Sequence, residues 1–165
     1  MSHRYWPQSV LFVCTGNIFR SLAAEQALKT MLGAESSLHV GSAGIDAKPQ
    51  AVHEWVQTRL RLKGADPSGH VQRQLTIEMV QAADLVIAMG CNHQLFIRDR
   101  FGHDVPLFNQ VCFGRDEPIE DLHEVMPKWE QNLEEARAYV WSVIDSIWEA
   151  TPALIQRLPS LRSLK

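Results

Sequence analysis

Cys14 and Arg20 are the two residues of this sequence whose types and spacing most clearly indicate a reaction. They stand six positions apart in the stretch VLFVCTGNIFRS, which begins at Val10. A thiolate is a strong nucleophile that can also leave again, so Cys14 could accept a phosphoryl group and later release it. The guanidinium of Arg20 offers a planar fork to two oxygens of a tetrahedral oxyanion. The pair therefore predicts phosphoryl chemistry.

The residues around this pair favour an anion site. A loop between a strand and a helix exposes backbone N–H groups without partners, and the helix dipole adds a positive field. Gly16 permits close backbone approach, and Asn17 tolerates a left-handed conformation. This field favours the thiolate of Cys14, and the Ser21 hydroxyl can donate to its sulfur. The spacing alone arises by chance in about one such sequence in five, so a buried structural cysteine is the alternative.

Apolar runs alternate with segments of helical period, and this order predicts the elements that position the loop. We expect strands in SVLFVC, SLHVGSAG, ADLVIAMG and VPLFN. We expect helices at 21–31, 52–60, 92–101 and from the capping residue Asn132 to Ile147. This alternation implies right-handed crossovers and a parallel sheet with helices on both faces. Ligands bind beyond the carboxyl ends of such strands, where Cys14 is expected.

The composition is that of an ordinary globular domain. The chain has 165 residues and a net charge of −3, so we expect neither nucleic acid nor a membrane as partner. The first residues, MSHRYWPQ, lack the apolar core of a signal peptide. The 3 cysteines make no disulfide framework and the 7 histidines show no ligand spacing, so we expect a cytoplasmic location, no cofactor and no metal. We divide the chain into a domain at 1–150 and a C-terminal extension at 151–165 that packs on the domain or on a partner.

These stretches together resemble the low-molecular-weight protein tyrosine phosphatase family, whose loop reads C-x-G-N-x-C-R-S. The segments GSAGIDA, GADPSGHVQRQLT and ADLVIAMGCNH are also similar to family segments, so the resemblance covers about residues 9–110. It implies a single-domain, three-layer α/β fold with a four-stranded parallel sheet of flavodoxin-like topology and a phosphate loop after the first strand. It also implies a phosphomonoester hydrolase that acts on phosphotyrosine proteins or small phosphomonoesters, as a monomer or weak dimer.

The resemblance also implies roles for individual residues. Cys14 would be the nucleophile and Arg20 the phosphate clamp. The implied phosphate-binding residues are Thr15, Gly16, Asn17, Ile18, Phe19 and Ser21. Ser42 and His70 would support the loop, although the residues alone suggest a turn serine and a solvated histidine. Phe19 departs from the family, which usually has a second cysteine there, so oxidised Cys14 would find no neighbouring thiol.

The general acid is harder to place. The family has it in an Asp-Pro pair before the last helix, but the Asp-Pro pair of this chain begins at Asp66. Counting forward from PLFN leads to Asp121, whereas counting back from Asn132 puts Lys128 in the position. We choose Asp121 and leave these alternatives open: Asp116, Glu117, Glu120, or no acid at all. Trp129 would either form an aromatic wall beside the substrate or pack in the core.

Two other functions are compatible with the loop. A thiol-dependent arsenate reductase needs two further thiols, for which Cys91 and Cys112 are the candidates. A non-catalytic phosphate- or phosphopeptide-binding module is the second alternative. Binding alone needs no thiolate, so the presence of Cys14 beside Arg20 favours the phosphatase.

Overall fold

The computed structural model of the protein describes residues 6–161. The strands are β1 (Ser9–Cys14), β2 (His39–Gly44) and β3 (Leu85–Ala88). The α-helices are α1 (Arg20–Leu32), α2 (Glu54–Leu62), α3 (Ile77–Ala82), α4 (Cys91–Phe101), α5 (Phe108–Phe113), α6 (Leu122–Val125) and α7 (Leu133–Arg157). Short 3-10 helices lie at Pro67–Gly69, Trp129–Gln131 and Leu158–Ser160.

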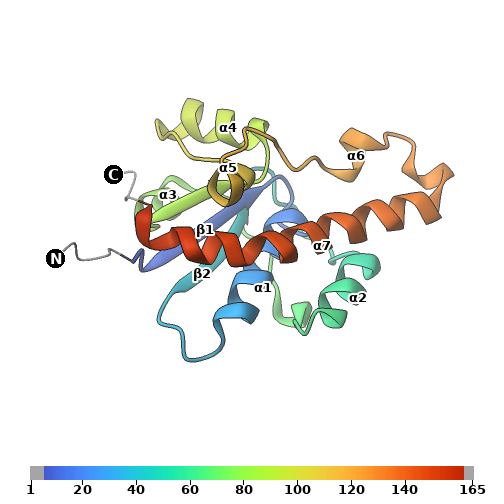
Figure 1. Cartoon of the computed structure of the whole chain (residues 1–165). Coiled ribbons are helices and arrows are strands. Elements are labelled where there is room, and N and C mark those ends of the chain that lie inside the picture. Colours follow the sequence, from blue (N-terminus) through green and yellow to red (C-terminus); the bar gives the residue numbers. More distant parts are fainter. Residues whose placement is uncertain (1–5, 162–165) are drawn as a thin grey trace.

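The sheet is parallel, with β1 at its centre in the order β2-β1-β3. The register places Cys14, the last residue of β1, opposite Gly44, the last residue of β2. The fourth strand, expected in VPLFN, is shortened to a parallel bridge between Ala88 and Leu107 on the outer side of β3. Pro106 has no N–H to donate to a longer ladder. Helices cover both faces of the sheet, as predicted (Figure 1).

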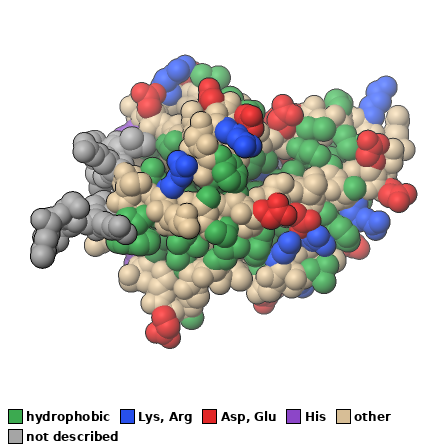
Figure 2. All heavy atoms as spheres, viewed as in Figure 1, with side chains coloured by type: hydrophobic (Ala, Val, Ile, Leu, Met, Phe, Trp, Pro, Cys, Tyr) green, Lys and Arg blue, Asp and Glu red, His purple; other side chains and the backbone are tan. Residues whose placement is uncertain are grey.

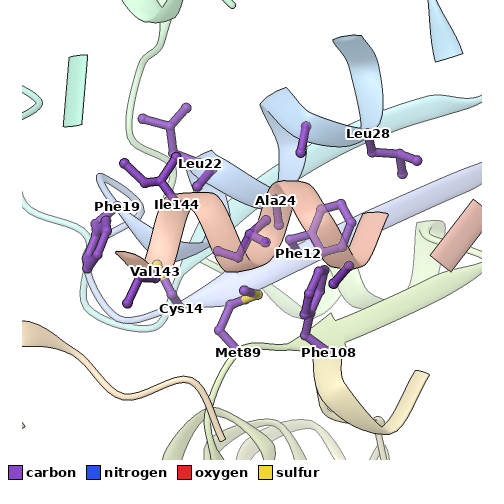
Figure 3. Packing of buried hydrophobic residues seen from close by; sticks show 14 of the residues in the cluster. Phe12, Cys14, Phe19, Leu22, Ala24, Leu28, Met89, Phe108, Val143 and Ile144 are labelled. Carbon is purple, nitrogen blue, oxygen red and sulfur yellow. The ribbon is translucent and has the colours of Figure 1, made fainter. Parts of the chain in front are cut away.

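Alternate residues of β1 pack into two hydrophobic cores, one on each face of the sheet. Val10, Phe12 and Cys14 belong to the larger core, which they share with α1, α2, α5 and α7 (Figure 3). Leu11 and Val13 belong to the smaller core, with α3 and α4. A strand covered on both faces needs apolar residues at every position, which explains the continuous run in SVLFVC.

Helix α7 reaches the edge of the molecule at which the strands end. It packs against α1, α2 and α5, and its N-terminal turns extend past the carboxyl ends of the strands, with α2 and α6 on either side (Figure 1). The helix continues to Arg157, and Leu154 and Leu158 are fully buried in the larger core. Residues 162–165 of the predicted extension, and residues 1–5 of MSHRYWPQ, lie outside the described residues.

Acidic and basic side chains are interspersed on the face that carries α7 (Figure 2). Within residues 6–161, none of the helices is both long and apolar enough to cross a membrane. The same part of the chain has no group of three or more His, Cys, Asp and Glu side chains that could hold a metal ion.

Candidate active site

The loop between β1 and α1 forms the floor of a cavity at the carboxyl edge of the sheet. Cys14 ends β1 and Arg20 begins α1, and both side chains are 2% exposed. β2 runs close beside this loop, because Gly44 lies against its backbone. A Cβ at Gly44 would collide with the carbonyl oxygen of Thr15. Glycine is therefore required at this end of β2, in the small-residue stretch GSAG.

Asn17 holds the loop in its shape. Its φ is 58°, the one positive φ of a non-glycine residue within residues 6–161. Its Nδ2 donates to the hydroxyls of Ser21 at 3.0 Å and Ser42 at 2.8 Å. Its Oδ1 accepts from the backbone N–H of Arg73 at 3.0 Å, and its carbonyl accepts from Nε2 of His70 at 2.6 Å. The structure thus brings Ser42 and His70 to the loop from distant segments.

The hydrogen-bond network around Asn17 extends through Ser21 to the sulfur of Cys14. Ser21 accepts from Asn17, and its oxygen lies 2.8 Å from Cys14 Sγ, so its hydroxyl hydrogen can donate to the sulfur when Cys14 is a thiolate. Ser42 likewise accepts from Asn17 and donates to Oε1 of Glu25 at 3.1 Å. A hydroxyl that donates to the sulfur favours the thiolate over the thiol.

Glu25 is part of this network and was missed from the sequence. It lies on α1, is 7% exposed and pairs with Lys29 at 3.3 Å. A buried carboxylate must be hydrogen-bonded, and here it directs the hydroxyl of Ser42 away from Asn17. The available signal was its position four residues after Ser21, which puts both on one face of the helix.

Arg20 connects the loop to the segment 115–121. Its Nη1 donates to the carbonyl of Ile119 at 2.8 Å. Its Nη2 lies 3.5 Å from Oγ1 of Thr15 and 3.7 Å from Oδ2 of Asp121. One buried guanidinium therefore contacts both sides of the cavity.

His93 is a second residue missed from the sequence, because it lies 78 positions from its partner. It is fully buried in the first turn of α4. Its Nδ1 accepts from the N–H of Gly90 at 2.9 Å, so Nε2 carries the proton and donates to Oγ1 of Thr15 at 2.9 Å. Burial, helped by the charge of Arg20, lowers the pKa of His93 to about 3, so the ring is neutral at physiological pH. The Thr15 hydroxyl keeps its own hydrogen for an oxyanion in the cavity.

The cavity has a volume of about 420 Å³ and lies between the loop, the start of α2 and α6. The loop residues that line it are Cys14, Thr15, Gly16, Ile18, Phe19 and Arg20. Asn17 and Ser21 do not line it; they are fully buried beneath the loop, so they shape it. The opposite wall is aromatic, with the rings of Trp55 and Trp129 edge to face at 5.9 Å and His53 4.5 Å from Trp55.

Among the acid candidates, Asp121 is the one that lines the cavity. It is the N-cap of α6, where its Oδ1 accepts from the N–H of Leu122 at 2.8 Å and its Oδ2 faces Arg20. The carboxyl group thus borders the cavity at the start of α6, with its second oxygen near Arg20. This geometry suits a group that donates a proton to a leaving atom.

The other acid candidates lie elsewhere. Asp116 accepts from the side chain of Gln110 at 3.0 Å. Glu117 and Glu120 line a separate groove beside α5 and α7. Lys128 precedes the 3-10 helix at 129–131 and does not line the cavity. The forward count from PLFN therefore identifies the residue that reaches the cavity.

Phe19 is 9% exposed, packs in the larger core and also lines the cavity (Figure 3).

The remaining cysteines are not placed for a thiol relay. Cys91 is exposed at the start of α4, and Cys112 is buried in α5, where burial raises its pKa to about 12. Neither lines the cavity with Cys14. The arrangement does not provide the successive thiols that arsenate reduction needs.

Comparison with known proteins agrees with the geometry of the loop. The family model for low molecular weight phosphotyrosine protein phosphatases matches residues 9–112. A protein-arginine-phosphatase of Bacillus subtilis is 36% identical over 100 residues, which cover 56% of this chain and 63% of that protein. The low molecular weight protein-tyrosine-phosphatase Ptp of Acinetobacter johnsonii is 35% identical over 91 residues, covering 54% and 62%. The chain thus spans less than two thirds of the length of these curated relatives.

Solved structures of this kind share the fold over nearly the whole chain. A mutant of the arginine phosphatase YwlE, with a phosphorylated active-site serine, has a TM-score of 0.79 at 27% identity, covering 95% of this chain and 99% of that one. YwlE from Geobacillus stearothermophilus has a TM-score of 0.77 at 26% identity, covering 93% and 94%. These relatives are named phosphatases, so an arsenate reductase or a binding module is not favoured. The family model matches more than half of the length of this chain. The chain therefore belongs to the low molecular weight phosphotyrosine protein phosphatase family.

Proposed function

We propose that the chain is a protein tyrosine phosphatase that acts through a cysteinyl-phosphate on Cys14. The observation that carries this proposal is the sulfur of Cys14 on the cavity floor, with the guanidinium of Arg20 lining the same cavity and the Ser21 hydroxyl 2.8 Å from the sulfur. Such a thiolate can attack phosphorus and leave again. Arg20 and the hydroxyl of Thr15 lie where they can bind the phosphoryl oxygens, over which negative charge is spread in the transition state.

The reaction has two balanced steps. In the first, the sulfur of Cys14 attacks phosphorus, an S–P bond forms and the bond from phosphorus to the phenolic oxygen breaks. Protonated Asp121 gives its proton to that oxygen. In the second, the oxygen of a water molecule bonds to phosphorus while the Asp121 carboxylate takes one of its protons, the S–P bond breaks, and inorganic phosphate and the thiolate are released. The first step needs a reduced Cys14, which is why we place the reaction in the cytoplasm.

The wall of the cavity supports a phenyl ring as the group attached to phosphate. Trp55 and Trp129 can pack against an aromatic ring edge to face or offset, and Ile18 adds an apolar contact. Phosphoarginine is the second candidate, because the Bacillus subtilis relative is named an arginine phosphatase. A guanidinium group also stacks on indole rings.

Hydrolysis by the purified, reduced protein tests the proposal. We expect turnover of p-nitrophenyl phosphate and of a phosphotyrosine peptide, both abolished by Cys14→Ser. Cys91→Ser is the matched control, since its exposed thiol lies outside the cavity, and it keeps full activity. Absence of hydrolysis between about pH 5 and 7 would contradict the proposal. Faster hydrolysis of a phosphoarginine peptide would replace tyrosine by arginine as the substrate residue.

A further inference from the structure

The segment that carries Asp121 has no regular structure of its own. Residues 115–121 form neither helix nor strand. The first half of the segment is fastened to α5, where Asn109 donates to the carbonyl of Glu117 at 3.0 Å and Gln110 donates to Asp116. The position of Asp121 therefore depends on what holds the second half, residues 119–121.

Three different elements hold that second half through its backbone. The N–H of Ile119 donates to the carbonyl of Met89, just after β3, at 2.8 Å. The carbonyl of Ile119 accepts from Arg20, at the start of α1, at 2.8 Å. The carbonyl of Glu120 accepts from the hydroxyl of Tyr139, on α7, at 2.6 Å. Of these three bonds, only the last lies beyond Ile119; the carbonyl of Asp121 itself accepts from Glu124 and Val125 within α6, at 3.1 and 3.2 Å.

The bond from Tyr139 acts on the peptide unit next to the acid. The carbonyl of Glu120 and the N–H of Asp121 belong to one planar peptide group. Fixing that carbonyl fixes the plane, and with it the direction in which the Cα of Asp121 presents its carboxyl group. The two bonds of Ile119 lie before this peptide group and the capping bonds of Asp121 to α6 lie after it, so the bond from Tyr139 is the one that acts on it directly.

We propose that Tyr139 is a positioning residue for the general acid, whose hydroxyl holds the carbonyl of Glu120 so that Asp121 stays directed over Cys14. Tyr139 does not touch the substrate, since it lines the separate groove beside α5 and α7. Tyr139 lies on α7, which packs against α1. The same pair of helices therefore positions both the loop and the acid segment. The inference rests on the proposed function, with Asp121 as the acid.

The hydroxyl of Tyr139 remains a donor throughout the working pH range. Burial, with the nearby carboxylates of Glu120, Asp121 and Glu124, raises its pKa to about 12, against the smaller opposing effect of Arg20. The O–H is therefore intact wherever the phosphatase reaction runs. No titration of this group is needed for the positioning.

Tyr139→Phe tests this role by removing one O–H. We expect kcat/KM, which reports the first step, to fall about 10-fold with phenyl phosphate, whose poor leaving group needs the acid, because a small misplacement of a reacting group is costly. With p-nitrophenyl phosphate, a much better leaving group, kcat/KM should change less than about 2-fold. A merely structural loss would lower both rates equally. Tyr139→Leu, which also lacks the hydroxyl, should show the same leaving-group dependence.

A double-mutant cycle and a matched control complete the test. In the Asp121→Asn background, Tyr139→Phe should have no further effect with phenyl phosphate, because the two residues act as one unit. Ser142→Ala is the control: this hydroxyl lines the same groove but donates to the carbonyl of Tyr139 in its own helix, at 2.7 Å, and its loss should leave both rates unchanged. Equal rates for wild type and Tyr139→Phe with phenyl phosphate, or additive losses in the cycle, would overturn the inference. A wild type inactive on both esters would instead overturn the proposed function.

Discussion

The phosphate loop and the acid segment face each other across the cavity, but they are held in different ways. The loop is supported from beneath by buried polar side chains, so that Asn17, Ser21 and Ser42 are at most 1% exposed. The acid segment is largely exposed, and its second half is held by single backbone bonds from separate elements. The loop is therefore rigid by its own network, whereas the acid takes its position from α6, for which it is the N-cap, and from bonds to α1, α7 and the end of β3. Damage to the loop should lower kcat/KM for every substrate, and damage to the acid segment should lower kcat/KM only for those with poor leaving groups.

Arg20→Lys should have the largest effect, because Arg20 contacts both regions. Lysine loses the planar fork for the phosphoryl oxygens and the bond to Ile119. We expect kcat/KM to fall by about 10³-fold with phenyl phosphate and with p-nitrophenyl phosphate alike. A loss confined to phenyl phosphate would mean that Arg20 serves the acid segment alone, and the contrast between the regions would fail.

Asp121→Asn should separate the two regions most clearly. Loss of a general acid lowers kcat/KM, which reports the first step, by about 10²-fold or more when the leaving group is poor, as in phenyl phosphate, and much less when it is good. Asp116→Asn is the matched control, because it changes a carboxylate of the same segment that bonds to Gln110 instead of lining the cavity. Equal losses in the two variants would remove Asp121 from the mechanism.

The burial of His93 beside the loop should make the free energy of unfolding sensitive to acid. The unfolded chain binds a proton at this histidine below about pH 6.5, whereas the folded chain does so only near its lowered pKa of about 3. The contribution of neutral, buried His93 to the free energy of unfolding is therefore fully present above about pH 6.5 and is lost as the pH falls toward its lowered pKa. Between pH 7.5 and pH 4 the unfolding free energy of the wild type should drop by about 3 kcal/mol more than that of His93→Gln, which does not titrate. Parallel curves from urea denaturation would contradict this.

Ser21→Ala should give the smallest of these effects. It removes the hydroxyl 2.8 Å from the sulfur of Cys14, and with it a hydrogen bond that stabilises negative charge on the reacting sulfur. We expect alkylation of Cys14 by iodoacetamide near pH 6 to slow about 10-fold, measured in a Cys91→Ser background. Ser146→Ala, whose hydroxyl bonds only within α7, is the control. An unchanged rate would show that the thiolate does not depend on Ser21.

The same contrast explains how much could be predicted from the sequence. The phosphate loop lies within eight consecutive residues, 14–21, so its residue types and the strand before it were enough to place the site. The helix expected at 21–31 is α1 at Arg20–Leu32. Glu25 and His93 were missed because they act through tertiary contacts that no local pattern encodes.

The acid segment resisted prediction for a physical reason. Two short helices, α6 and the 3-10 helix at 129–131, lie between Asp121 and the cap at Asn132. They lengthen the connection, so the count back from Asn132 reached Lys128 while the count forward reached Asp121. Only the folded chain shows which of the two faces the cavity. Ser42 and His70 came from the family resemblance, since neither has a local signal of its own.

The most direct test of the account is to trap the intermediate that joins the two regions. Asp121→Asn lacks the base for the second step, so the cysteinyl-phosphate should accumulate when p-nitrophenyl phosphate is added and the reaction is quenched within milliseconds. Mass spectrometry should then find one phosphoryl group on the peptide that contains Cys14, together with a burst of p-nitrophenol equal to the enzyme concentration. A variant that turns over without a burst, and whose Cys14 peptide is never phosphorylated, would contradict the account.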